Sequence, residues 1–169
     1  MSLCDPMTLQ TFNFIDFTDL IIMIYLGSDH AGFELKEKVK VFLENAGYET
    51  ADLGAFQNDS GDDYPDFILP VANSVAADLI KGVESKGIIF GGSGEGEAMA
   101  ANRVDGARAA EYYGGPLEIV KLSREHNNAN ILSLGARFVS EEEALSAVKL
   151  WLTTPFSGDD RHIRRIMKF

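Results

Sequence analysis

The chain has 169 residues, 46% of them hydrophobic and 24% charged, a balance typical of a single globular domain. A formal net charge of −11 disfavours nonspecific binding to nucleic acid or to an anionic membrane surface. Cys4 is the single cysteine, which excludes an intrachain disulfide framework and favours a reducing compartment, so we expect a cytoplasmic protein.

Residues 1–22 differ from the rest of the chain, and we interpret them as an atypical N-terminal extension ahead of a single domain over 23–169. The segment lacks a basic region and a long apolar stretch, so neither a signal peptide nor a membrane helix is expected there. An added sequence, a true start at Met23 and an ordered extra strand all remain open interpretations.

The spacing of apolar residues predicts a buried strand over 23–27, an amphipathic helix over 32–47 and a second strand over 48–53. Gly47 is expected just past the end of the helix. The predicted apolar face of this helix comprises Leu35, Val39, Phe42, Leu43 and Ala46.

Residues 58–66 form a polar loop in this prediction, with Asp62 and Asp63 in turns. The helix predicted over 67–81 tolerates Pro70 only near its start.

The last nine residues carry four basic side chains and no acid, which indicates a basic tail or a local anion site. The remaining predictions are strands over 87–90, 107–112 and 130–134, and helices over 97–103, 117–124 and 141–152.

Strands alternate with helices along the chain, and several strands are continuous apolar runs. This pattern predicts an α/β fold, with a doubly wound, mostly parallel sheet and helices on both faces, similar to a Rossmann fold. Ligands of such folds bind beyond the carboxyl ends of the strands. Chemically capable residues follow three of the predicted strands: Asp29 and His30, the glycine-rich segment 91–97, and Arg137.

The segment Gly-Gly-Ser-Gly-Glu-Gly-Glu over 91–97 is the strongest local signal. Backbone amides in such a turn can converge on a small oxyanion at a helix N-terminus, although a turn without a ligand is the alternative. Neither the GxGxxG fingerprint nor a P-loop motif is met, which disfavours a nucleotide-binding module. The candidate oxyanion donors are Gly92, Ser93, Gly94, Glu95 and Gly96.

Three side chains are candidates for acid–base chemistry, and each has a structural alternative. Glu97 could be a general base, or it could only favour the helix dipole, which would lower its basicity. Asp29 could be an acid–base group or the N-cap of the first helix. His126 could be a proton shuttle or a favourable charge at a helix C-terminus.

Arginine side chains offer a second type of site. Arg137, Arg161 and Arg165 could clamp a phosphate, since guanidinium groups match phosphate oxygens, whereas the alternative for the last two is a solvated tail. The chain contains only three histidines and no paired cysteine motif, so metal binding has little support.

Five segments in this order resemble one family, the type B ribose-5-phosphate isomerases, which also includes the galactose-6-phosphate isomerase subunits. The resemblance extends from Met23 to Phe169. The matching segments are YLGSDHAGFELK, DDYPDF, GIIFGGSGEGEAMAANRVDGARAA, LSREHNNANILSLGAR and RHIRR.

The resemblance implies an enzyme without metal or organic cofactor, and a homodimer or tetramer with sites at the subunit interface. Within it, Asp29 and His126 resemble the pair that opens the sugar ring, and Glu97 resembles the base that moves a proton between C1 and C2. The turn over 92–96 resembles the cradle of the enediolate. The implied sugar and phosphate contacts are Asn127, His30, Arg137, Arg161 and Arg165.

The sequence departs from the family pattern at two places. Part of the family has a cysteine base at the position of Gly91, so the sequence is similar to the subgroup in which a glutamate, here Glu97, is the base. The stretch Glu111-Tyr112-Tyr113 also differs from the family pattern, so the sugar stays open. Ribose 5-phosphate is the expected substrate, and the alternatives are allose or galactose 6-phosphate, or a noncatalytic phosphosugar-binding protein.

Overall fold

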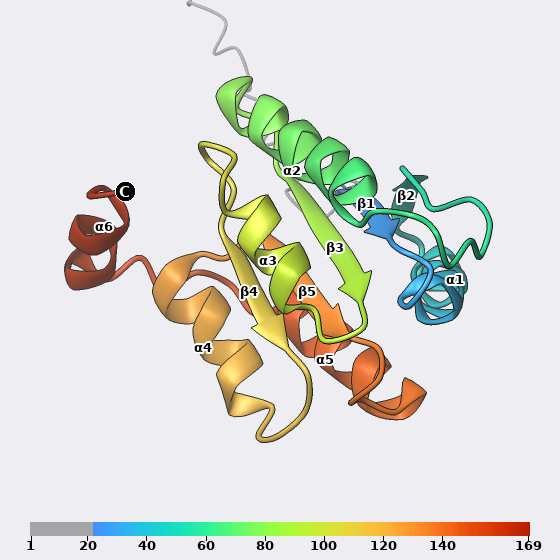
Figure 1. Cartoon of the computed structure of the whole chain (residues 1–169). Helices are drawn as coiled ribbons and strands as arrows, with labels where there is room; N and C mark the ends of the chain where they lie inside the picture. The colour runs from blue at the N-terminus through green and yellow to red at the C-terminus, as the bar shows by residue number, and fades with distance from the viewer. Residues whose placement is uncertain (1–21) are drawn as a thin grey trace, which may run out of the picture.

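The computed structural model describes residues 22–169 of the chain (Figure 1). The predicted extension over 1–22 lies outside the described residues, except for Ile22. The described part contains a five-stranded parallel sheet with the strand order β2-β1-β3-β5-β4. The strands are β1 (Met23–Ser28), β2 (Glu49–Asp52), β3 (Ser85–Gly91), β4 (Ala109–Tyr112) and β5 (Ile131–Gly135).

Helices cover both faces of this sheet, which confirms the predicted doubly wound α/β fold (Figure 1). α2 and α3 pack on one face, while α1 and α5 pack on the other, with α4 beside α5 and β4. The helices are α1 (Phe33–Asn45), α2 (Pro65–Ile80), α3 (Glu95–Ala101), α4 (Glu118–Asn127), α5 (Glu141–Thr153) and α6 (Asp160–Ile166).

The central strand β3 explains why apolar runs predicted buried strands. Ile88 and Phe90 point into the core under α1 and α5, and Ile89 points into the core under α2. All three side chains are fully buried. Because side chains alternate between the two faces, a strand covered on both faces has to be apolar at every position.

The first helix departs from the prediction at both of its ends. Its N-cap is Gly32, and Asp29 accepts a hydrogen bond from the Gly32 amide over 3.0 Å, so Asp29 is not the cap residue itself. Gly47 follows the helix with a φ of +86°, as expected, but Ala46 is exposed. The side chain missing from the predicted core is Lys36, which is fully buried.

Lys36 is tolerated in the core because its ammonium group is fully paired. Its Nζ donates to both carboxylate oxygens of Asp52, at 2.6 and 2.7 Å, and to the carbonyl oxygen of Ala55 at 2.9 Å. A buried charge costs free energy unless it is paired and hydrogen-bonded. This interaction fixes the chain just after β2, where the loop toward the site begins.

Helix α2 begins earlier than predicted, with Pro65 at its first position, where a missing N–H costs nothing. Pro70 then lies inside the helix and not near its start, and its exposed position leaves solvent to satisfy the unpaired carbonyl. None of the helices described over 22–169 is long and apolar enough to cross a bilayer.

The basic C-terminal segment forms the short helix α6, which the spacing of apolar residues did not predict. α6 lies apart from the sheet and packs beside α4 (Figure 1). His162 anchors it, since this side chain is 4% exposed although its neighbours are solvated. The basic residues of α6 therefore have defined positions.

Candidate active site

Three neighbouring strands end at one cavity. β1, β3 and β5 are adjacent and parallel, so the residues that follow them meet at the carboxyl edge of the sheet. The cavity has a volume of about 360 Å³, and its walls come from these three strand ends and from Tyr64. It is lined by Asp29, His30, Ala31, Tyr64, Gly92, Ser93, Gly96, Glu97 and Arg137.

Glu97 lies in the first turn of α3 and is 4% exposed, although it lines this cavity. Burial raises the pKa of its carboxyl group, and the negative charge of Asp29 raises it further. The backbone amides of Glu97 and Gly94 act in the opposite direction but do not reverse the shift. Burial therefore outweighs the helix N-terminus, and Glu97 keeps the basicity that proton abstraction needs.

Gly91 makes room for this carboxyl group. A Cβ atom at position 91 would overlap Oε1, Cδ and Oε2 of Glu97. Any other residue at position 91 would therefore displace the Glu97 carboxyl group from its present position. The buried position of Glu97 in α3 therefore requires a glycine at the end of β3.

The turn between β3 and α3 forms one wall of the cavity, and Gly94 caps α3 with a φ of +86°. Gly92, Ser93 and Gly96 line the cavity. Gly94 is buried behind them and accepts a hydrogen bond from Ser133 Oγ at 2.6 Å. The Glu95 amide donates to Ser93 Oγ at 3.3 Å, so this amide already has a partner.

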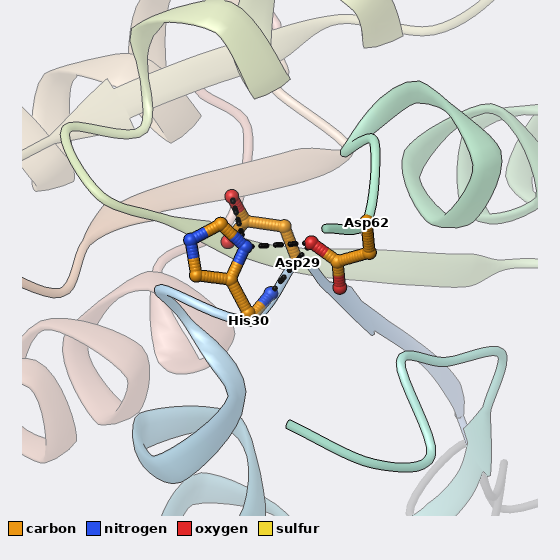
Figure 2. Close-up of side chains that lie close together, drawn as sticks. All are labelled: Asp29, His30 and Asp62. Carbon is orange, nitrogen blue, oxygen red and sulfur yellow. Dashed lines mark hydrogen bonds and ion pairs between the residues drawn. The ribbon is translucent and has the colours of Figure 1, made fainter. Parts of the chain in front are cut away.

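His30 is held by Asp62, a residue that the sequence analysis assigned only to a turn (Figure 2). The Asp62 carboxylate accepts from the backbone amide of His30 at 3.2 Å and from its Nδ1 at 2.6 Å. Asp62 raises the pKa of His30, with a further contribution from Asp29, while Arg137 lowers it. The sole signal in the sequence is that Asp62 lies in the segment DDYPDF, which carries part of the resemblance.

The same side chains have the spacing of a metal site. Asp29, His30 and Asp62 offer ligand atoms within 4.8 Å of one another. A metal-bound histidine nitrogen has to be unprotonated. The distance of 2.6 Å between His30 Nδ1 and Asp62 Oδ1 is that of a hydrogen bond, in which Nδ1 would carry the proton. The hydrogen bonds between His30 and Asp62 therefore account for the close spacing of these two side chains.

Arg137 completes the side of the cavity next to Gly92. A Cβ at position 92 would lie 3.2 Å from the Arg137 guanidinium carbon, so glycine lets the arginine lie against the turn. Arg137 is exposed and follows β5 directly. Tyr64, which no motif in the sequence indicated as a site residue, lies at the start of α2 with its ring against Gly96.

Four predicted site residues lie elsewhere. His126 and Asn127 end α4, just before β5 begins, which places them at the amino edge of the sheet. The five residues of β5 separate them from Arg137 by about 16 Å. Arg161 and Arg165 are on α6, which packs beside α4. Within one chain, these side chains and Glu97 are at opposite ends of the sheet.

His126 nevertheless has a defined orientation. Its ring stacks on His162, with the ring centroids 4.2 Å apart and an interplanar angle of 14°. Burial lowers the pKa of His162, and His126 and Arg161 lower it further, which favours the neutral form of His162. The stack joins the end of α4 to α6, and the sequence analysis gave His162 no role.

Glu111 is a further carboxyl group with a perturbed pKa. Burial, together with the charges of Glu95 and Glu97, raises its pKa to about 7. Its Oε1 is buried and has no hydrogen-bond partner among residues 22–169. Tyr113, two residues further along the chain, contacts Phe138 edge to face, with ring centroids 6.1 Å apart.

Comparison with known proteins identifies relatives over the described part of the chain. The family model described as Ribose/Galactose Isomerase matches residues 24–169. Ribose-5-phosphate isomerase B of Mycolicibacterium paratuberculosis is 48% identical over 143 residues, which cover 85% of this chain and 86% of that protein. The enzyme of the same name from Mycobacterium tuberculosis is 45% identical, with 85% of each chain covered.

Solved structures agree with these relatives. Ribose-5-phosphate isomerase B from Mycoplasma genitalium, with bound ribulose 5-phosphate, superposes with a TM-score of 0.81 at 38% identity. The match covers 87% of this chain and 93% of that one. The Thermotoga maritima protein has a TM-score of 0.78 at 44% identity, with coverages of 87% and 96%.

Proposed function

Because the chain belongs to the ribose/galactose isomerase family, we propose that it interconverts ribose 5-phosphate and ribulose 5-phosphate as a cofactor-independent aldose–ketose isomerase. The observation that carries this proposal is the buried Glu97 carboxyl group, with a raised pKa, beside the glycine-rich turn that lines the same cavity. A protein that only binds phosphosugars needs the turn and the arginine but not a buried base, which disfavours the noncatalytic alternative.

Aldose–ketose isomerisation removes a proton from C2 of the open-chain sugar and returns it to C1 through an enediolate. In the proposed mechanism Glu97 moves this proton. The developing oxyanion meets the turn over 92–96, where Gly92, Ser93 and Gly96 line the cavity. Donors fixed by the fold stabilise this charge without reorganisation, which is commonly the largest contribution to catalysis.

Substrate phosphate would bind at the cationic side of the cavity. Arg137 lies there, together with His30, whose pKa is raised by its hydrogen bond to Asp62. The phosphate does not take part in the proton transfer, so its binding serves to orient C1 and C2 against Glu97. Asp29, 8% exposed and next to Glu97, would act in ring opening.

Two subunits are required by this mechanism if His126 acts on the sugar. His126 and Glu97 of one chain lie at opposite sheet edges, so His126, Asn127, Arg161 and Arg165 would reach the cavity of a partner subunit. The stack of His126 on His162 supports this proposal, because it joins the end of α4 to α6 and so keeps the four side chains on neighbouring elements. We therefore propose a homodimer, or a tetramer made of two such dimers, in the cytoplasm.

A mixing experiment tests the shared site. The Glu97→Gln and His126→Ala variants should each be inactive alone. Equal amounts of the two variants are mixed, unfolded and refolded together. Random pairing gives about a quarter of the wild-type activity if each site takes Glu97 and His126 from different subunits. A mixture that stays inactive would show that both residues serve the same site.

The substrate is tested with a panel of aldose phosphates. We expect the highest kcat/KM for ribose 5-phosphate, above allose 6-phosphate and galactose 6-phosphate. The departure at Glu111-Tyr112-Tyr113 is the reason to include the six-carbon sugars, and a preference for one of them would replace the proposed substrate. Absence of turnover on every sugar, with binding retained, would refute the isomerase.

A further inference from the structure

A second cavity lies at the amino edge of the sheet, at the opposite end from Glu97. Its volume is about 460 Å³, and it is formed by the end of α2, the start of β3 and the segments that flank β5. Three cationic side chains line it, namely Lys86, Arg108 and Arg124. Glu84 is the single acidic residue among its lining residues, and the Glu84 side chain is 60% exposed.

These cations are unusual because two of them are buried and the third, Arg108, is half-buried, in a chain with a net charge of −11. Lys86 is 4% exposed and Arg124 is 5% exposed. Burial lowers the pKa of the side chains of Lys86, Arg108 and Arg124, and Arg124 is further affected by the like charge of Arg108. Buried charges are normally paired, and here the one carboxylate in the lining, Glu84, faces three cationic side chains.

Part of each guanidinium group has a structural role. Arg108 Nε donates to the Asn128 carbonyl at 3.0 Å, and Arg124 Nη1 donates to Asn128 Oδ1 at 3.0 Å and to the carbonyl of Ala129. Arg124 Nε donates to the Thr154 carbonyl at 3.2 Å. Asn128 therefore holds the two guanidinium groups close together.

These contacts leave donors for a ligand. Among residues 22–169, neither Arg108 Nη2 nor Arg124 Nη2 has a hydrogen-bond partner, and neither atom is sealed from solvent. Lys86 Nζ uses one of its three protons on Glu84, at 2.6 Å. Hydrogen bonds to the chain thus account for the Nε and Nη1 donors of the two arginines. Both Nη2 groups, and two of the three Lys86 protons, remain without a partner among the described residues.

We propose that this cavity is a second anion site, which binds the phosphate group of a small organic phosphate. Two guanidinium edges and one ammonium group match the oxygens of a phosphate dianion. Val75, Leu79 and Phe156 supply apolar lining, and the cavity volume is in the range of small-molecule sites. Because the two cavities lie at opposite ends of the strands, this ligand would bind independently of the sugar phosphate.

Crystals of the full chain soaked in tungstate, a tetrahedral phosphate analogue, test the location. We expect anomalous density within hydrogen-bond distance of Lys86 Nζ and the two Nη2 atoms. The Lys86→Met variant should lose this density and keep any density beside Arg137. An amino-edge cavity that stays empty while the Arg137 cavity is filled would overturn the proposal.

Titration calorimetry tests the site in solution, with inorganic phosphate and phenyl phosphate as separate probes. The wild-type chain should bind one more anion per chain than Lys86→Met, or bind it at least about tenfold more tightly, as expected for one charge-assisted hydrogen bond. Tighter binding of phenyl phosphate would indicate an organic phosphate, and equal binding would indicate free phosphate at the same site.

Lys149→Met is the matched control, because Lys149 is exposed on α5 and lies outside this cavity. It should bind as the wild type does, and Lys86→Met should keep the wild-type isomerase activity. Lys86→Gln, which is polar, provides a second variant if the methionine variant folds poorly. Equal binding by the wild type and a folded Lys86 variant would refute the site.

Discussion

The substitution Gly91→Ala should displace the Glu97 carboxyl group without removing it. It therefore tests whether the position of this group matters for catalysis. Gly91 ends β3, pairs with Gly135 of β5 and has no left-handed backbone conformation. The added Cβ would overlap three atoms of Glu97, all of which belong to its carboxyl group. The carboxyl group is the end of a flexible side chain, so it can move while the strand stays in place.

The size of the effect follows from this geometry. A reacting group displaced by about 1 Å can cost roughly 10²-fold in rate, and a general base contributes about 10²–10⁴-fold in typical enzymes. We therefore expect kcat for ribose 5-phosphate to fall by about 10²-fold or more. The KM should change little, because His30 and Arg137 are untouched. Alanine is also favoured over glycine in a strand by about 0.5–1 kcal/mol, so the fold should persist.

A coupled assay of ribulose 5-phosphate formation gives kcat and KM, and thermal unfolding reports on the fold. Gly61→Ala is the control, because a Cβ at position 61 meets no atom closer than 3.4 Å and the backbone is not left-handed. It should leave kcat unchanged. A folded Gly91→Ala enzyme with wild-type kcat would refute the assignment of Glu97, in its present position, as the base.

Glu97→Gln should abolish turnover and keep sugar-phosphate binding, which calorimetry can measure, and in the wild type kcat should fall as the pH drops through a Glu97 pKa above 4.5. Asp62→Asn should lower the pKa of His30, so that KM rises at neutral pH and recovers in acid while kcat changes little; an unchanged KM–pH profile would argue against the His–Asp pair. Glu111 has a folded-state pKa of about 7 against an ordinary 4.5, so its protonated form contributes stability below pH 4.5 that is lost as the pH rises through 7. Chemical denaturation of Glu111→Gln from pH 4 to 8 should therefore show a smaller decline than the wild type. Ser140→Ala removes the capping box with Glu143 and should lower the free energy of unfolding by about 1 kcal/mol without changing kcat.

Local patterns in the sequence were sufficient for most of the fold. The apolar runs of β1, β3 and β5 are buried on both faces, so their composition alone indicated parallel strands. Glycine at position 47 marked the end of α1. The helix α6 was missed because seven residues with several charges have little apolar periodicity, and its one buried anchor, His162, contacts another element.

The candidate site was predictable only in part. The carboxyl edges of parallel strands coincide by construction, so Asp29, His30, Glu97 and Arg137 could be assigned to one place before the structure was known. Asp62 could not, because it lies 32 residues from His30 and a loop aspartate has the same local signature whether it forms a turn or a hydrogen bond.

The sequence by itself therefore determined the class of fold and the groups at the carboxyl edge, since both depend on period and order along the chain. The tertiary structure decided three further features, all of which depend on contacts between distant segments. It showed that burial outweighs the helix dipole at Glu97, and that Lys36 is a paired core residue. It also stacked His126 at the end of α4 on His162 of α6, a contact between residues far apart in the sequence.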